Sequence, residues 1–270
     1  LRLRKSAAEL RIMRRAGALT ARGHCRAMRA CRPGLYEYQL EAELLHEFMH
    51  GGARSPAYSS IVGGGDNACI MHYVENSARL ENGQLVLIDA GAELDHYAAD
   101  VTRTFPVNGR FTETQRLLYE VVLRAQRAAI AAVVPGSDFN APHRAAAVEI
   151  TRGLMDLGLL EGKLRALVNK EAYREFFIHS TGHWLGLDVH DVGEYRLNGD
   201  WRPLEPGMVL TIEPGVYVAP DNTRVAVKWR GTGIRIEDDV VVTEEGCEVL
   251  TGAVPTSVEA IEELVGSSAL

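Results

Sequence analysis

The chain has little cysteine, no long apolar run and no excess of positive charge. Its four cysteines form no CxxC pair and are too few for a disulfide scaffold, so we expect a reducing compartment and a cytoplasmic protein. No segment approaches the roughly 20 uncharged apolar residues of a membrane span, and we see no pattern of a secretory signal. Lys and Arg number 29 against 36 Asp and Glu, a net charge of −7, which argues against a nucleic-acid-binding surface.

What the chain does contain is typical of a folded globular protein. Of its 270 residues 46% are apolar and 24% charged, and mean hydropathy is −0.08. A chain of this length can bury roughly three quarters of its unfolded surface without disulfides. We find no repeat or linker and expect a single domain over residues 1–270. Because the chain begins at Leu1 rather than with methionine, we expect it to be a fragment or a processed product.

The order of helical and strand patterns predicts a mixed α+β fold. The first helix should stop at Pro33-Gly34 and the second at Gly51-Gly52, because these residues break helices. Helices, strands, helices and strands follow one another, which differs from an alternating βαβ chain and hints at two similar halves. We expect helices at 7–30, 37–50, 112–134, 141–157 and 257–265, and strands at 68–73, 85–90, 97–106, 208–212, 216–218 and 233–242.

Two aspartates lie on a predicted hairpin. Asp89 ends an apolar strand, and Asp100 lies within the next strand after a short polar turn. If the hairpin is symmetric about Leu94 and Asp95, the two aspartates lie directly opposite each other, with Cβ atoms ~5 Å apart. Carboxylates at that distance repel unless a cation or a shared proton lies between them. Either aspartate alone could simply cap a turn, but the opposed pair favours a site.

Histidines and one glutamate follow in the second half. His179, His183 and His190 lie close together among glycines that let the backbone approach closely, a pattern typical of a lined cleft. A single histidine would more often be structural. Glu213 ends an apolar strand and precedes Pro214, which cannot donate to a sheet, so this carboxylate is well placed to face a site.

The last strand pattern places polar side chains on one face. Its period of two puts Ile234 and Ile236 on the core face and Arg235 with Glu237 on the other. Taken alone, this segment fits a solvated edge face better than a site.

Together these residues form a possible metal-binding set. Carboxylates with one imidazole suit Mn²⁺, Fe²⁺ or Co²⁺ better than a sulfur-ligated zinc site. Four carboxylates match two divalent ions in charge, and such an ion pair lowers the pKa of water and polarises a carbonyl. The set comprises Asp89, Asp100, His183, Glu213 and Glu237.

A second metal motif competes with this set. The segment His46-Glu47-Phe48-Met49-His50 matches the HExxH pattern of zinc peptidases on a predicted helix. However, Phe48 belongs to the buried face, from which both histidines point partly away, and no third ligand follows at the expected spacing. We therefore favour the carboxylate set.

At these positions the chain resembles the metal-dependent aminopeptidase P and prolidase family, metallopeptidase family M24. The motifs spread in the family's order over most of the chain, and two of them, Thr102–Pro106 and His183–Gly193, point to an Xaa-Pro aminopeptidase. The resemblance implies the pita-bread fold, a curved and mostly antiparallel sheet flanked by helices, with pseudo-twofold halves. The motifs are Met71–Tyr73, Ile88–Gly91, Asp100–Pro106, His179–Gly193, Leu204–Tyr217 and Gly233–Asp239.

The resemblance also implies roles for the metal ligands. Two divalent ions, Mn²⁺ first and otherwise Co²⁺, Fe²⁺ or Zn²⁺, would activate a bridging hydroxide that attacks the bond between the first residue and a proline. Asp89 would bind one ion, Asp100 and Glu237 would bridge both, and His183 and Glu213 would complete the other. Glu213 would also move the proton.

Other residues would act on the substrate or on the ligands. His72 and His190 would bind the substrate and its oxyanion, and His179 would line the proline side of the cleft. Arg235 and Tyr217 would fix the ligand carboxylates. The resemblance further implies that an upstream domain of full-length relatives is absent here, and homo-oligomer formation stays open.

Three alternatives stay open beside an enzyme that acts on peptides with N-terminal Xaa-Pro. A proline dipeptidase and a methionine aminopeptidase share the fold. A metal-free peptide-binding module is less favoured, because such a chain should have replaced at least one of the five ligands, and none is replaced here.

Overall fold

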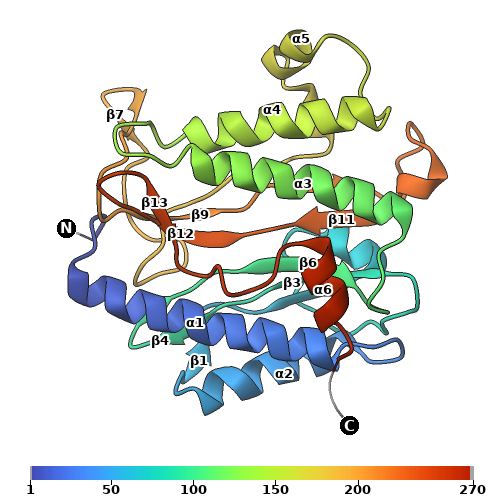
Figure 1. Ribbon diagram of the computed structural model, residues 1–270, viewed down its shortest axis with the longest axis horizontal. Helices are drawn as coiled ribbons and strands as arrows, with labels where there is room; N and C mark the ends of the chain where they lie inside the picture. The colour runs from blue at the N-terminus through green and yellow to red at the C-terminus, as the bar shows by residue number, and fades with distance from the viewer. Residues whose placement is uncertain (1, 268–270) are drawn as a thin grey trace.

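Layers of helices enclose the strands in the computed structural model, which describes residues 2–267. Figure 1 shows α1 and α2 along one edge, α3 and α4 along the opposite edge, and the strands between them. The first pair of helices packs on β1, β2, β4 and β5, and α3 packs on β9, β10 and β11. The helices are α1 (Ala7–Ala30), α2 (Glu37–His50), α3 (Glu113–Ala131), α4 (Ala141–Asp156), α5 (Leu164–Asn169) and α6 (Val258–Leu264).

Local chemistry fixes the helix ends. In α1 the Ser6 hydroxyl accepts from the Glu9 N–H while the Glu9 carboxylate accepts from the Ser6 N–H, a capping box that satisfies two free donors. Thr112 and Gln115 repeat this arrangement before α3. The predicted bounds of α1 and α2 are confirmed, and the other three predicted helices are present with ends that differ by one to three residues.

The strands form small antiparallel sheets. The order is β2-β3-β6 in one half and β9-β12-β13 in the other, with β10-β11, β1-β4-β5 and β7-β8 beside them. The same order, helices followed by strands, therefore occurs twice along the chain. The strands are β1 (Ser55–Pro56), β2 (Ile61–Gly64), β3 (Leu85–Asp89), β4 (Ala92–Leu94), β5 (Tyr97–Ala98), β6 (Thr102–Pro106), β7 (Arg196–Leu197), β8 (Asp200–Trp201), β9 (Val209–Ile212), β10 (Gly215–Val218), β11 (Thr232–Arg235), β12 (Asp238–Val242) and β13 (Cys247–Val249).

Two predicted strands are each broken in the middle. The segment 97–106 divides into β5, which pairs with β4, and β6, which pairs with β3. The segment 233–242 divides into β11, which pairs with β10, and β12, which pairs with β9. The prediction of two continuous strands was therefore wrong. It was made because apolar residues lie on both sides of each break. Each break lets one stretch of chain serve two sheets.

The predicted strand at 68–73 is also wrong. The strand beside β3 is β2, and residues Gly65–Cys69 form a 3₁₀ turn instead. Gly65 has φ +55°, a left-handed conformation that glycine adopts without strain and that ends β2. Ala68 then packs against β11, where a Cβ on Gly233 would lie 2.1 Å from the Ala68 carbonyl oxygen. The apolar residues here are used in turn packing, not in a ladder.

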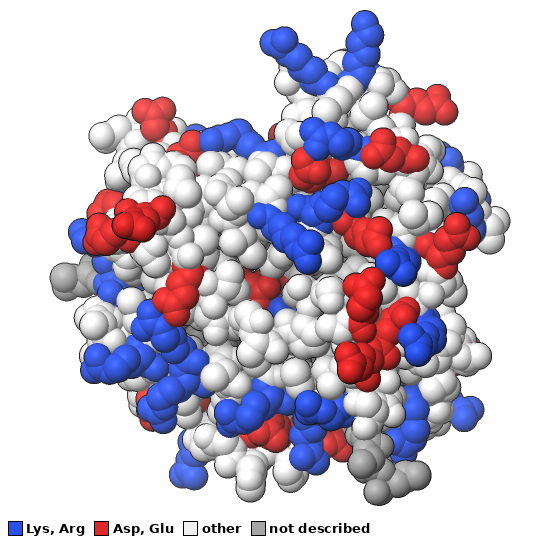
Figure 2. Space-filling view, viewed as in Figure 1, with Lys and Arg blue, Asp and Glu red and all other residues white. Residues whose placement is uncertain are grey.

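The surface in the same view carries charges of both signs. Figure 2 shows blue side chains gathered over the part of this face where α1 runs, with red ones among them. Several arginines of α1 are paired with acids, among them Arg14 with Glu248 at 2.6 Å and Arg22 with Glu47 at 2.9 Å. None of the helices within residues 2–267 is long and apolar enough to cross a membrane.

Candidate metal centre

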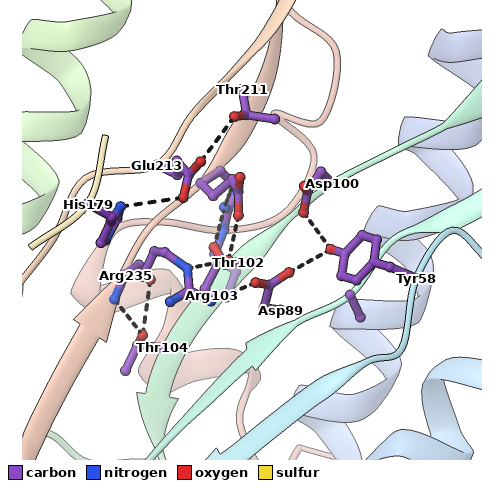
Figure 3. Close-up of polar contacts among 12 residues, drawn as sticks. Tyr58, Asp89, Asp100, Thr102, Arg103, Thr104, His179, Thr211, Glu213 and Arg235 are labelled. Carbon is purple, nitrogen blue, oxygen red and sulfur yellow. Dashed lines mark hydrogen bonds and ion pairs between the residues drawn. The ribbon is translucent and has the colours of Figure 1, made fainter. Parts of the chain in front are cut away.

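Four carboxylates lie where strands end or break. Asp89 is the last residue of β3, Asp100 lies between β5 and β6, Glu213 between β9 and β10, and Glu237 between β11 and β12. The two central breaks are tied together, because the Glu237 N–H donates to the Thr102 carbonyl at 3.1 Å. A break releases a side chain from the alternation of a strand. Figure 3 shows Asp89, Asp100 and Glu213 around one space, and Glu237 belongs to the same ligand group as Asp100.

The predicted hairpin register, with Asp89 opposite Asp100, is wrong by two residues. Asp89 pairs with Thr102, and Leu94 pairs with Tyr97, so the turn consists of Asp95 and His96. Both turn residues have positive φ, +50° and +71°, as a type I′ turn requires. Asp100 therefore does not lie directly opposite Asp89 in a ladder. The two carboxylates still converge, because the chain bends between them.

This bend depends on Gly91. A Cβ at Gly91 would lie 1.6 Å from the Ala99 carbonyl oxygen, so no other residue fits the close approach. Gly182 plays a similar part below His183, where a Cβ would lie 2.0 Å from the Thr211 carbonyl oxygen.

Three of the predicted ligands form a compact group. Ligand atoms of Asp100, His183 and Glu237 lie within 4.8 Å of one another, the one such group found among the described residues. His183 Nε2 lies 3.4 Å from Asp100 Oδ2 and 3.8 Å from Glu213 Oε1. Asp89 lies beside the group, joined to Asp100 through a tyrosine described below.

The histidine is oriented for coordination. His183 Nδ1 lies 3.0 Å from the Trp184 carbonyl oxygen, so the Nδ1–H donates there and Nε2 turns toward the carboxylates. Burial opposes the charged form, but the contact with Asp100 and the charge of Glu213 outweigh it and raise the pKa of His183 to about 9. A divalent cation would balance the negative charge of these acids, as the proton on His183 does.

Mutual repulsion in a buried place marks the acids as a cation site. Burial, with the charges of Asp100 and Glu213, raises the pKa of Glu237 well above its usual range. Burial raises the pKa of Glu213 to about 7, although His183 and Arg235 oppose the shift. Burial and the charge of Asp89 raise the pKa of Asp100. This donor set, oxygen-rich with one imidazole, fits divalent cations.

Arg235 is a buried cation that orders the acids. Its side chain donates to Asp89 Oδ2 at 2.6 Å and, through Nε, to the Thr102 hydroxyl at 3.0 Å. Thr102 in turn donates to Glu237 Oε2 at 2.6 Å. Arg235 and Glu237 are each only 2% exposed, so the solvated face that this segment favours when taken alone is wrong.

Tyr217 and His179 continue the same chain of hydrogen bonds. Arg235 Nη1 donates to the Tyr217 hydroxyl at 2.8 Å, and this hydroxyl lies 3.0 Å from His179 Nε2. Because the His179 Nδ1 contacts the Ser180 carbonyl at 2.7 Å and donates to it, Nε2 accepts from Tyr217. Burial, together with the charge of Arg235, lowers the pKa of His179 to about 3, so this ring is neutral at neutral pH.

His72 and His190 lie at the exposed edge of the site. Both are exposed, and the His190 ring lies 4.4 Å from that of His183, centroid to centroid, with an edge-to-face tilt. Burial and the neighbouring charges of His183 and His72 lower the pKa of His190. His190 therefore borders the centre on the solvent side, and exposed His72 is near enough for its charge to act on His190.

Sequence reasoning missed Tyr58, a half-buried residue between β1 and β2. Its hydroxyl lies 2.6 Å from Asp89 Oδ1 and 2.5 Å from Asp100 Oδ1, so it can donate to either one (Figure 3). An isolated tyrosine in a polar loop carries no signal in the sequence.

Sequence reasoning also missed Arg103, a buried arginine next to the site. Arg103 is fully buried and donates to Asp238 Oδ1 at 2.8 Å and to the Glu237 carbonyl at 2.5 Å. Gln126 donates to the other Asp238 oxygen at 2.7 Å. No role was assigned to Arg103 from the sequence, because a single arginine within an apolar strand does not show what it pairs with.

The HExxH motif lies away from this group. His46 and His50 are exposed on α2, with stacked rings 5.9 Å apart, and Glu47 pairs with Arg22 at 2.9 Å. No third ligand joins them in any ligand group found among residues 2–267.

Comparison with known sequences decides the family. The sequence model of metallopeptidase family M24 matches residues 11–244. The chain belongs to this family. It is 50% identical over 265 residues to the Xaa-Pro aminopeptidase of Haemophilus influenzae and 51% identical over 265 residues to that of Escherichia coli K12. Each match covers 98% of this chain but only 61% and 60% of the relatives, so the chain spans about three fifths of their length.

Solved structures of aminopeptidases have the same fold as this chain. The aminopeptidase PepP of Pseudomonas aeruginosa has a TM-score of 0.97 and 60% identity, covering 97% of this chain and 60% of that one. A zinc-substituted E. coli aminopeptidase P in complex with product has a TM-score of 0.95 and 51% identity, covering 97% of this chain and 59% of that one. The expected pita-bread fold is confirmed.

Proposed function

We propose that this M24 chain is the catalytic domain of a metal-dependent aminopeptidase that releases the first residue from peptides with proline in second position. The convergence of four carboxylates and one imidazole at strand breaks is the observation that carries the proposal. The two bacterial relatives that are about half identical are Xaa-Pro aminopeptidases, which supports the substrate class.

We propose that the site takes two divalent ions, with Mn²⁺ the first candidate. Asp89, Asp100, Glu237, His183 and Glu213 would bind them. The ligand group found within residues 2–267 contains no cysteine that would favour a soft metal. Bound there, the ions would lower the pKa of a water molecule and polarise the scissile carbonyl. The E. coli relative solved with zinc substituted supports a site that tolerates several metals.

The remaining residues would bind the substrate and move a proton. Exposed His190, whose ring contacts His183, and its neighbour His72 would bind the peptide carbonyl through their ring N–H groups. Glu213, whose carboxylate lies 3.8 Å from His183 Nε2, would also accept and return a proton. His179, neutral and fixed by Tyr217, would line the proline side.

Arg235 and Tyr217 would act as positioning residues. Arg235 contacts Asp89 directly and reaches Glu237 through Thr102, so it would keep both carboxylates oriented. We further propose that the 270 residues form a single catalytic domain of a cytoplasmic protein, and homo-oligomer formation stays open.

Three substrates separate the candidate activities. Ala-Pro-Ala tests for the aminopeptidase, the dipeptide Ala-Pro for a dipeptidase, and Met-Ala-Ser for a methionine aminopeptidase. The dipeptidase is worth testing because a human Xaa-Pro dipeptidase is 37% identical to this chain over 294 residues. We expect Mn²⁺-dependent release of alanine from Ala-Pro-Ala and its loss with EDTA. Preferred cleavage of either other substrate, or cleavage that persists in EDTA, would contradict the proposal.

A further inference from the structure

The segment that follows His183 is a closed loop ending beside His190. We call residues 183–191 the histidine loop. The Asp191 N–H donates to the Trp184 carbonyl at 2.9 Å, and the Gly186 N–H donates to the Asp188 carbonyl at 3.1 Å. A Cβ on Gly186 would lie 2.2 Å from Asp191 Oδ2, so this carboxylate fills the inside of the loop. The position of Asp191 therefore fixes the position of its neighbour His190.

Asp191 is held by the chain ahead of α1. Lys5 Nζ donates to Asp191 Oδ2 at 3.1 Å, and both side chains are 1% exposed. Arg2 donates to Asp191 Oδ1 and, at 2.7 Å, to Asp188 Oδ2. The Val192 N–H donates to Asp191 Oδ1 at 3.0 Å. The three contacts of the Asp191 carboxylate come from charged or backbone donors, so both of its oxygens are paired.

Lys5 itself is anchored to the sheet. Its N–H donates to the Gly207 carbonyl at 2.7 Å, and the Gly207 N–H donates to the Val242 carbonyl at 2.9 Å. Arg4 forms an isolated bridge with Met208, just before β9. The ammonium of Lys5 thus reaches the histidine loop from a backbone fixed to the strands that also carry Glu213.

Such a buried ion pair specifies a position more than it adds stability. Removing one partner leaves an uncompensated buried charge, whereas replacing both by neutral residues is often tolerated. Burial lowers the pKa of Lys5, and Asp191 supplies the largest opposing effect. The pair joins two segments that are 186 residues apart in the sequence. The loop that it holds brings the His183 and His190 rings to a centroid distance of 4.4 Å.

We propose that Lys5 and Asp191 are positioning residues for His190. The ion pair ties the histidine loop to the segment that precedes α1 and thereby fixes the His190 ring against His183 at the edge of the metal centre. This inference rests on the proposed function for the role of His190 in binding the substrate. Lys5 and Asp191 are not among the proposed metal ligands or substrate-binding residues, and act only through the loop.

A double-mutant cycle with His190 tests this proposal. Lys5→Met should lower kcat/KM for Ala-Pro-Ala at least about tenfold, since a displaced binding group costs catalysis steeply. In a His190→Ala background the same change should cost less than about twofold, because its target is already gone. Leu44→Ala, a buried change in α2, serves as the control for lost stability. An equal loss from Lys5→Met in both backgrounds would overturn the proposal.

Hydrogen exchange gives a readout that needs no activity. In Lys5→Met the amides of Gly186 and Asp191 should exchange faster than in wild type, and in Leu44→Ala they should not exchange faster than the rest of the sheet. If Lys5→Met fails to fold, the Lys5→Met/Asp191→Asn double variant removes both charges and restores folding while the loop stays untied. Unchanged loop exchange would refute the positioning role, whether or not wild type cleaves Ala-Pro-Ala.

Discussion

At the scale of single residues, the site is a set of carboxylates whose charged form is disfavoured by burial. Burial, with the charges of neighbouring carboxylates, raises the pKa values of Glu213, Glu237 and Asp100, which favours a cation between them. Chemistry of this kind is predictable from the sequence, because acids and histidines next to strand ends are conspicuous. Tyr58 and Thr102 were not predictable as site residues, because a lone hydroxyl side chain gives no pattern until the fold brings it to a partner.

Thr102 provides a test of the links between Arg235 and Glu237. Thr102→Val keeps the shape but removes the hydroxyl that accepts from Arg235 and donates to Glu237. We expect metal affinity to fall roughly 10- to 100-fold, as is typical when a group supporting a ligand is lost. Competition with a fluorescent chelator measures this affinity. Thr151→Val, a fully buried change in α4, is the matched control, and an equal effect in both variants would contradict the link.

Glu213 predicts a pH dependence of stability in the metal-free protein. Its pKa rises from 4.5 in the unfolded chain to about 7 in the folded one, so the folded state binds the extra proton between these values. The stability from this proton is complete below pH 4.5 and is lost as the pH rises through 7. The lost free energy of unfolding is on the order of 3 kcal/mol.

Urea unfolding in EDTA measures this effect in wild type and in Glu213→Gln. Between pH 4.5 and 8, wild type should lose on the order of 3 kcal/mol more than the variant, which has no proton to release there. Parallel pH profiles for the two proteins would mean that Glu213 does not titrate as its burial requires.

At the scale of elements, the sequence predicts what local chemistry decides. The bounds of α1 and α2 follow from a capping box and from Pro and Gly residues at their ends, and both are confirmed. The breaks at Asp100 and Glu237 were missed because apolar residues continue on both sides, and only sheet pairing shows where a strand changes partner. The hairpin register was wrong because the turn falls at Asp95-His96, a pair without the glycine that usually marks such turns.

The bend after β3 can be tested at Gly91. Gly91→Ala would place a Cβ 1.6 Å from the Ala99 carbonyl, so the chain must move apart where Asp89 and Asp100 converge. We expect a loss of more than about 3 kcal/mol of unfolding free energy and loss of metal binding in whatever folds. Gly246→Ala, with nothing within 4 Å of its Cβ, is the control for urea unfolding and metal titration. Near-wild-type stability of Gly91→Ala would contradict the close approach.

At the scale of the whole molecule, two helix-and-strand halves contribute the residues of the proposed metal centre. Asp89 and Asp100 come from the first half, and His183, Glu213 and Glu237 from the second. Neither half holds enough carboxylates for two ions alone, so the centre can form only when both halves fold together. The negative charge of the site therefore lies between the two halves. A cation that binds there stabilises the native state, because it binds the folded chain in preference to the unfolded one.

Counting ions per chain tests the central claim most directly. Protein stripped with EDTA is dialysed against excess Mn²⁺, freed of unbound metal, and analysed by elemental mass spectrometry, with His46→Ala as a control outside the centre. We predict two ions per chain in wild type and in His46→Ala, and fewer than one in Glu237→Ala, which loses a carboxylate shared by the whole group. Wild type without bound Mn²⁺, or Glu237→Ala that still binds two ions, would contradict the account.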